Sequence, residues 1–256
     1  MGLLDRLFKR KTATSKEAAE KEPPALEVPP DRADTSFVWS AASTREKDDF
    51  LRAHLTRINR YLNEDELQNE FHPPALKDMI MNGPAIDQVE DPSGEFGRSR
   101  DNPIPVNGPL GESTYLSRLR FASNGQKLMY HRLGCLGGGL RLVVNVYETA
   151  TWDGLHWDIL YFEMYHPVKT RLAPEGYEFD KIVVGLSGTT QLLPTFPKGI
   201  ITAVAEGAMQ LIGFPAREPM MRRYEAMEEL KRPAEQEAAV EQVMAEIKKL
   251  RDKVSN

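Results

Sequence analysis

The sequence has one cysteine and no long hydrophobic run. Cys135 is the only cysteine among 256 residues, so no disulfide can form within the chain, and a reducing compartment is favoured. No run of about 18 apolar residues is present, so the sequence predicts no membrane-spanning helix. The N-terminus lacks the apolar core and cleavage site of a secretory signal. Together these absences predict a cytoplasmic protein.

A strong excess of positive charge is also missing. The formal net charge is −5 at pH 7, with 33 Lys and Arg residues against 38 Asp and Glu residues. Binding to the phosphate backbone of nucleic acids depends on many cationic contacts. The charge balance therefore disfavours nucleic acid as the main partner.

Motifs for catalysis and for metal binding are incomplete. Ser187 follows Gly185 but lacks the second glycine of a nucleophile elbow. The run Gly134–Gly139 fits neither a dinucleotide fingerprint nor a phosphate-binding loop. The histidines show no metal-binding spacing such as H-E-x-x-H. The sequence therefore predicts no metal and no cofactor, and favours a protein without catalytic activity.

One enzymatic alternative stays open. Cys135 stands beside glycines, and His131 or His166 would supply the imidazole that turns a thiol into a nucleophile. Such a site belongs to a small hydrolase or transferase. The spacing does not force an imidazole to meet the thiol, and a lone cysteine beside a strand is more often a small buried apolar residue.

Strand patterns are concentrated between Tyr115 and Tyr165. Asn124-Gly125 and Asp153-Gly154 are both typical of two-residue hairpin turns, so two consecutive hairpins are predicted. The strands expected are 115–122 with 126–133, and 141–152 with 156–165. The expected cross-strand pairs are Phe121–Leu128, Leu119–Tyr130, Tyr147–Leu160 and Asn145–Phe162. The second hairpin is apolar on both faces, which predicts a central position in the sheet.

Further elements complete an α+β domain over residues 37–214. Apolar spacing predicts helices over 45–62, with a buried stripe that includes Leu55 and Leu62, over 75–81 and over 200–212, and a further strand over 181–186. The predicted fold is an antiparallel sheet of about five strands, two consecutive hairpins plus one, with helices packed on one face. The proline-rich stretch 101–112 carries Ile104 and Val106. It is interpreted either as a binding loop or as a segment that covers the edge of the sheet.

The two ends of the chain have a different composition. Residues 1–11 place Leu3, Leu4, Leu7 and Phe8 on one helical face with basic neighbours. The pattern is similar to the short amphipathic targeting helices of peripheral bacterial membrane proteins. Residues 12–36 form a linker rich in Pro, Glu and Lys, predicted to be disordered. Contact with an anionic membrane surface is one prediction for residues 1–11, and a frayed terminus or a helix docked on a partner protein are the alternatives.

Residues 215–256 predict a charged helical extension. Near its end an apolar seam has the spacing of a short coiled coil, formed by Val240, Val243, Ile247, Leu250 and Val254. This seam predicts either self-association, or contact with a partner protein, or a helix packed on its own domain. The same C-terminal helix and the loop 101–112 are the expected partner surfaces.

Candidate ligand-binding residues lie on the first hairpin and before it. Arg118, Arg120 and His131 share a face that is predicted to be wet, and Asn102 and Asn107 stand in the proline-rich loop. A cationic sheet face suits a ligand or a single-stranded nucleic acid. Taken together, the sequence predicts a non-catalytic interaction or adaptor protein of bacterial type, peripheral to the inner face of the membrane through its N-terminus. The enzyme and the sheet-face binder are the alternatives.

Overall fold

The computed structural model describes residues 42–137, 143–204 and 230–255. The chain divides into two compact units, Met1–His54 and Leu55–Asn256, and the sheet and its covering helices belong to the second unit. The helix predicted over 1–11, its linker and the methionine-rich stretch 220–227 lie outside the described residues.

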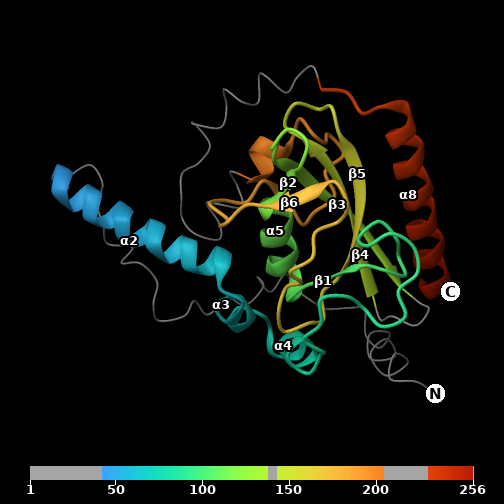
Figure 1. The fold of residues 1–256 in the computed structure, drawn as a ribbon, viewed down its shortest axis with the longest axis horizontal. Coiled ribbons are helices and arrows are strands. Elements are labelled where there is room, and N and C mark those ends of the chain that lie inside the picture. Colours follow the sequence, from blue (N-terminus) through green and yellow to red (C-terminus); the bar gives the residue numbers. More distant parts are fainter. Residues whose placement is uncertain (1–41, 138–142, 205–229, 256) are drawn as a thin grey trace, which may run out of the picture. The chain divides into compact units, whose positions relative to one another are not determined.

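The centre of the fold is a mixed sheet with the strand order β1-β5-β4-β3-β7 (Figure 1). Its three long inner strands pair antiparallel, whereas the short edge strands β1 and β7 pair parallel to their neighbours. The strands are β1 (Ile104–Pro105), β3 (Leu128–Gly137), β4 (Val143–Thr151), β5 (Trp157–Glu163) and β7 (Gly188–Thr189). The predicted α+β class with a mainly antiparallel sheet is confirmed, and the parallel edges are an addition to it.

The hairpin of β4 and β5 has the register that the sequence predicts. Asn145 pairs with Phe162 and Tyr147 pairs with Leu160. Gly154 occupies the turn with a φ of 70°, a conformation that favours glycine. Both strands lie inside the sheet, so the prediction of a central second hairpin is confirmed.

The second strand of the predicted first hairpin forms, as β3 from Leu128 onward, whereas most of its first strand and its pairing are wrong. Residues Gly108–Arg118 form helix α5, and only Leu119–Phe121 is extended, as β2. β2 pairs with β6 (Tyr177–Phe179) in a separate two-stranded sheet. The loop Ala122–Gly125 is longer than a two-residue turn, because the Phe121 amide donates to the Gln126 carbonyl at 2.8 Å. The predicted Phe121–Leu128 and Leu119–Tyr130 pairs therefore do not form.

Helix α5 begins at Gly108, directly after Asn107, a residue pair that is typical of turns. Pro109 lies in the first turn of the helix, where its missing N–H costs nothing. Gly108 has a φ of 76°, and a Cβ at this position would approach the His72 ring to 2.3 Å. Tyr115 and Leu116 of α5 pack into the core cluster that contains Phe162. Burial against the sheet outweighs the strand pattern of this stretch.

Helices cover both faces of the sheet, whereas the sequence predicted cover on one. α5 packs on one face with the largest apolar cluster. The opposite face carries α8 (Ala234–Ser255) and the helical residues 200–204, whose Ile200, Ile201 and Val204 pack with Met129 and Ala150. Figure 1 shows α8 alongside the sheet. Of the face predicted to be wet, His131 lies in this buried layer, whereas Arg118 belongs to α5 and Arg120 to β2.

The predicted apolar seam of the C-terminal helix packs within the chain. Val240, Val243 and Ile247 form a cluster with three sheet residues, Leu133, Leu136 and Val146, and Leu250 packs against that cluster. The side chain of Val254 lies outside the described residues. The described seam residues therefore pack on the chain's own domain, which is one of the three alternatives predicted from the sequence.

The remaining helices precede the sheet in the chain. They are α2 (Thr44–Asn63), α3 (Asp65–Glu70) and α4 (Pro74–Met81). α2 and α4 were predicted with nearly these bounds, and α3 was not predicted. Leu62 of α2 is buried as predicted, but Leu55 is 57% exposed, so the predicted buried stripe is wrong at that residue.

Two further predictions concern the edges of the sheet. Ile104–Pro105 forms edge strand β1, and the Val106 amide donates to the Glu163 carbonyl at 2.9 Å. Ile104 and Val106 are fully buried, so this stretch covers the sheet edge. The strand predicted over 181–186 is absent, since β6 ends at Phe179 and β7 begins at Gly188.

Candidate functional site

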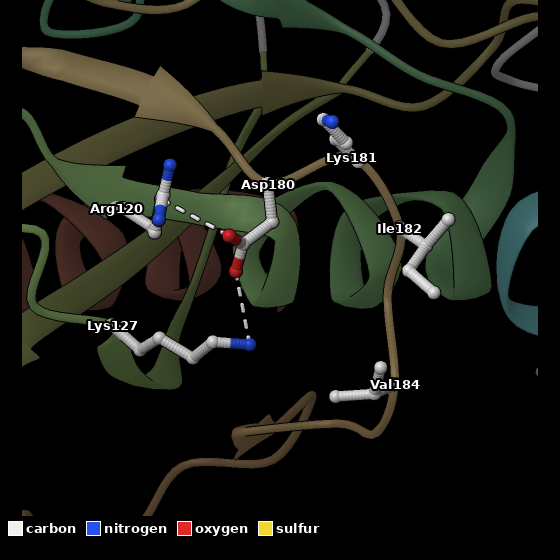
Figure 2. Close-up of a pocket in the computed structure, with 6 residues that line it drawn as sticks. All are labelled: Arg120, Lys127, Asp180, Lys181, Ile182 and Val184. Carbon is white, nitrogen blue, oxygen red and sulfur yellow. Dashed lines mark ion pairs between the residues drawn. The ribbon is translucent and has the colours of Figure 1, made fainter.

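A pocket of about 410 Å³ opens beside the small β2–β6 sheet (Figure 2). Three segments supply its lining: β2, the residue before β3, and the stretch that follows β6. The lining residues are Arg120, Lys127, Asp180, Lys181, Ile182 and Val184. The pocket forms at the point where an isolated antiparallel bridge brings Lys127 opposite Arg120.

Asp180 is the hub of the pocket. Its carboxylate lies 3.0 Å from Arg120 Nε and 3.0 Å from Lys127 Nζ, the two ion pairs drawn in Figure 2. Arg120 Nε is close enough for an ion pair but makes no hydrogen bond, because it is not aligned with the carboxylate. Arg118 also fixes this residue, since its Nε donates to the Asp180 carbonyl at 2.6 Å.

The lining of the pocket carries a surplus of positive charge. Arg120, Lys127 and Lys181 stand against the single carboxylate of Asp180. Arg120 also pairs with Glu178 at 3.1 Å, a half-exposed residue outside the lining. Lys181 makes no ion pair with any residue that the structure describes. One carboxylate shared by two cations leaves the site able to attract a further anion.

Apolar side chains stand beside these cations. Ile182 is 46% exposed and Val184 is 69% exposed. Val183 between them is buried, and the Asn63 side chain bonds both of its main-chain groups. Asn63 Nδ2 donates to the Val183 carbonyl at 2.9 Å, and the Val183 amide donates to Asn63 Oδ1 at 2.8 Å. The segment is thus held in place while two large apolar groups face solvent.

The predicted binding residues are divided between this pocket and the interior. Arg120 lines the pocket and Arg118 holds its hub, with its guanidinium 4.9 Å from the Phe179 ring centroid. Asn102 is buried, and its Nδ2 donates to the Gly94 carbonyl at 2.9 Å. Asn107 is also buried, and its Nδ2 donates to the side-chain oxygens of Gln68 and Asn69. The two asparagines hold loops in place and do not face the pocket.

The pocket contains residues that the sequence reasoning missed. Lys127 was placed inside a strand by the predicted hairpin register, and Asp180 and Lys181 were assigned to no site. The signal that could have found them is local: an acid and a lysine directly before the strand-like run 182–184. The missing step was the pairing of β2 with β6, which no local pattern indicates.

His131 is buried on the opposite side of the main sheet from α5. Its Nδ1 accepts the Leu193 amide hydrogen at 3.0 Å, so its Nε2 carries the proton and donates to Glu148 at 2.8 Å. Arg232 binds the same carboxylate with two nitrogens, at 2.7 and 2.8 Å. Both nitrogens of the His131 ring are therefore engaged.

Burial acts to raise the pKa of Glu148, but hydrogen bonds from His131 and Arg232 outweigh it and hold the pKa below its usual value. Glu148 therefore stays ionised at neutral pH. Its carboxylate fastens the segment before α8 to the sheet, because Arg232 lies just ahead of that helix. The prediction that His131 faces solvent is wrong, and its ring instead links Glu148 to the Leu193 amide in the interior.

The thiol and His131 lie on opposite faces of the sheet. Cys135 pairs with Asn145, whereas His131 pairs with Glu148. Directly paired residues share a face, and residues three apart on one strand do not. Cys135 is exposed on the α5 side. His166 is buried, and its Nδ1 donates to the Pro84 carbonyl at 2.8 Å. The structure does not bring Cys135 and His131 together.

A buried acid lies beneath that thiol-bearing face. Glu112 of α5 is 1% exposed and accepts from Asn145 Nδ2 at 2.5 Å and from the Tyr147 hydroxyl at 2.7 Å. Arg132 in turn donates to Asn145 Oδ1 at 2.7 Å. Burial raises the pKa of Glu112 to about 7, although the two hydrogen bonds act against it. The group joins helix to sheet and does not reach the surface.

Within residues 42–137, 143–204 and 230–255, no group of three His, Cys, Asp or Glu side chains is placed to hold a metal ion. Among the same residues no helix combines the length and the apolar character needed to cross a membrane.

Comparison with protein families, with curated proteins and with solved structures gives no match to this chain. A functional proposal therefore has to rest on the pocket and its chemistry.

Proposed function

We propose that this chain is a non-catalytic interaction or adaptor protein of bacterial type whose partner binds at the Arg120–Lys127–Lys181 pocket. One observation carries the proposal: a cation-lined pocket stands directly beside exposed Ile182 and Val184. Partner surfaces combine apolar contact area with charges that select and orient the partner. Lone exposed apolar residues are ordinary, but this pair flanks a pocket.

The state of the reactive groups also supports a role without catalysis. His131 has both ring nitrogens engaged, and Glu148 is bound by His131 and Arg232. Glu112 is buried beneath the sheet surface. A general base must reach a substrate proton at hydrogen-bond distance, and neither carboxylate faces the pocket described for this part of the chain.

The partner surface is placed at the pocket for a physical reason. The seam residues Val240, Val243 and Ile247 pack on the sheet, and Ile104 and Val106 are buried at its edge. Side chains that are already buried have little area left to give to a partner. The N-terminal segment 1–11 is proposed to add a weak contact with an anionic membrane surface, on the strength of its basic amphipathic pattern.

The test uses a photo-crosslinking amino acid placed at single positions of the full chain in the cells from which the sequence comes. We expect a discrete protein adduct from position 184, which borders the pocket. The adduct should weaken when Lys127 and Lys181 are both changed to Gln, because the pocket then loses two of its three cations.

The matched control carries the crosslinker at Ala245, an exposed position on α8. The charge control changes Lys248 and Lys249, exposed lysines of α8, to Gln and should leave the adduct at position 184 intact. An adduct at position 245 alone would move the partner surface to α8. The absence of adducts at both positions would refute the interaction role.

A further inference from the structure

We infer that residues 181–186, which form no strand in the free chain, become a strand when an extended acidic segment of the partner protein pairs with their open edge. The inference rests on the proposed function, and it specifies the chemistry and the binding mode of the partner. Three features of the segment support it: its sequence, its main-chain hydrogen bonds and the charge that surrounds it.

The sequence of the segment is that of a strand. Ile182, Val183 and Val184 are β-branched residues, which favour extended backbone. Lys181 and Gly185 flank them. Yet the structure forms no strand here, although β6 ends just before the segment and β7 begins just after it. A segment that favours the strand conformation but pairs with no strand is expected at the edge of a sheet that lacks one strand.

The hydrogen bonds show which edge is open. Side-chain burial alternates, since Val183 points inward while Ile182 and Val184 point to solvent. Asn63 satisfies both main-chain groups of Val183, in the way a neighbouring strand would. The free chain bends at Lys181, Ile182 and Gly185, so a strand over 181–186 forms only when these bends straighten. In the straightened chain the N–H and C=O groups of the residues adjacent to Val183 point away from Asn63. The main-chain groups of Ile182 and Val184 bond to no residue that the structure describes.

An open edge of this kind is a template for another strand. Binding by strand addition takes its affinity from main-chain hydrogen bonds and its specificity from flanking side chains.

The charge beside the edge selects the occupant. Lys181 lies on the segment itself, and Arg120 and Lys127 line the pocket next to it (Figure 2). A strand added here therefore meets cations, so acidic side chains are favoured and basic ones are repelled. A second copy of this chain is a poorer match, because its own edge presents Lys181 again. The structure assigns the edge to an acidic, extended peptide in which acidic and apolar residues alternate.

The probe is a fluorescein-labelled peptide in which Val and Glu alternate between terminal serines, titrated by anisotropy against the full chain. We expect saturable binding. Replacing each Glu by Gln should weaken it at least about tenfold, and N-methylation of alternate peptide amides should do the same. The first change removes charge and the second removes main-chain donors. Both act on the peptide and leave the protein unaltered.

Protein variants test the same edge from the other side. Val184→Pro removes an N–H that bonds to no residue within 42–137, 143–204 or 230–255, and proline favours extended backbone at the preceding residue. It should abolish peptide binding, whereas Val184→Thr keeps the N–H and should bind like the wild type. Changing Lys127 and Lys181 to Gln should remove the preference for Glu over Gln peptides, and the same change at Lys248 and Lys249 should not.

Several outcomes would overturn the inference. They are no binding of the Val-Glu peptide, binding that N-methylation leaves unchanged, and a concentration-dependent dimer of the full chain that Val184→Pro dissolves. If Val184→Pro fails to fold, the N-methylated peptides on the wild-type chain decide. A crosslink at position 184 without peptide binding would refute strand addition and leave the interaction role standing. If neither the crosslink at position 184 nor peptide binding is observed, both the interaction role and strand addition are refuted.

Discussion

Glu112 shows how one buried carboxyl couples folding to pH. Burial raises its pKa from 4.5 to about 7 in the folded chain. Between these two values the folded state holds a proton that the unfolded state releases, so raising the pH favours unfolding. The loss of stability caused by ionising the buried Glu112 carboxyl is absent below about pH 4.5 and complete above about pH 7. A shift of this size corresponds to about 3 kcal/mol.

We therefore predict that Glu112→Gln flattens part of the pH dependence of stability. The wild type should lose about 3 kcal/mol relative to the variant between about pH 5 and about pH 8, because glutamine carries no ionisable group. The single oxygen of glutamine can accept from Asn145 Nδ2, and its NH2 group can donate to the Tyr147 hydroxyl oxygen, which reverses the second hydrogen bond. Urea unfolding of both proteins across this range measures the difference. Parallel curves for the two proteins would contradict the prediction.

At the scale of single residues, the sequence indicates on which face of its own strand a side chain stands, but not which distant residues it meets. Arg120 is predicted as a binding residue from the alternation of its strand, and the structure places it in the lining of the pocket. The sequence predicts that His131 faces solvent. In the structure Phe196 stacks on its ring, and the Glu148 carboxylate that it binds is shared with Arg232. These partners are far away in sequence. No local pattern shows that a face is covered by elements that come much later in the chain.

At the scale of elements, the two turn dipeptides had different outcomes for a physical reason. Asp153-Gly154 lies in the short loop between β4 and β5, which fixes the register of the strands it joins, and the predicted pairs form. Asn124-Gly125 comes after a stretch whose polar and apolar residues also suit a helix. Burial of Tyr115 and Leu116 makes that stretch α5. The strand pattern of residues 181–186 has a third outcome, a strand-like segment without a strand partner.

Helix α8 gives the prediction at this scale. Ile247 is buried against Leu133, Leu136 and Val146, and its side chain lies close to Gly134. Ile247→Ala should lower the free energy of unfolding by about 3 kcal/mol, because it leaves a cavity between helix and sheet. Urea unfolding measures the loss, and Ala245→Ser on the exposed side of the same helix is the control.

The same variant separates packing from association. If the seam packs within the chain, Ile247→Ala changes stability and leaves the mass in sedimentation equilibrium as it is. A variant that unfolds like the wild type but sediments at a lower mass would contradict the intramolecular packing. It would return the seam to a partner or to a second copy.

At the scale of the whole molecule, the net charge does not show where positive charge is locally concentrated. The net charge of −5 disfavours an anionic partner, yet the pocket gathers three cations around one carboxylate. Composition describes the average of the chain and could not locate this exception. Fold class could be predicted because period and turn signals accumulate over many residues. The pocket could not, because it depends on the single pairing of β2 with β6.

The basic amphipathic pattern of residues 1–11 gives the last prediction. The full chain should co-sediment with vesicles that contain phosphatidylglycerol and not with vesicles of phosphatidylcholine alone, because binding combines apolar insertion with charge attraction. Changing Leu4 and Leu7 to Glu should abolish pelleting. The same charge change at Thr12 and Thr14, in the adjoining linker, should weaken it far less. Added salt should weaken the wild-type interaction by screening it. Equal pelleting of the wild type and the Leu4, Leu7 variant would refute the membrane contact and leave a protein as the ligand of this segment.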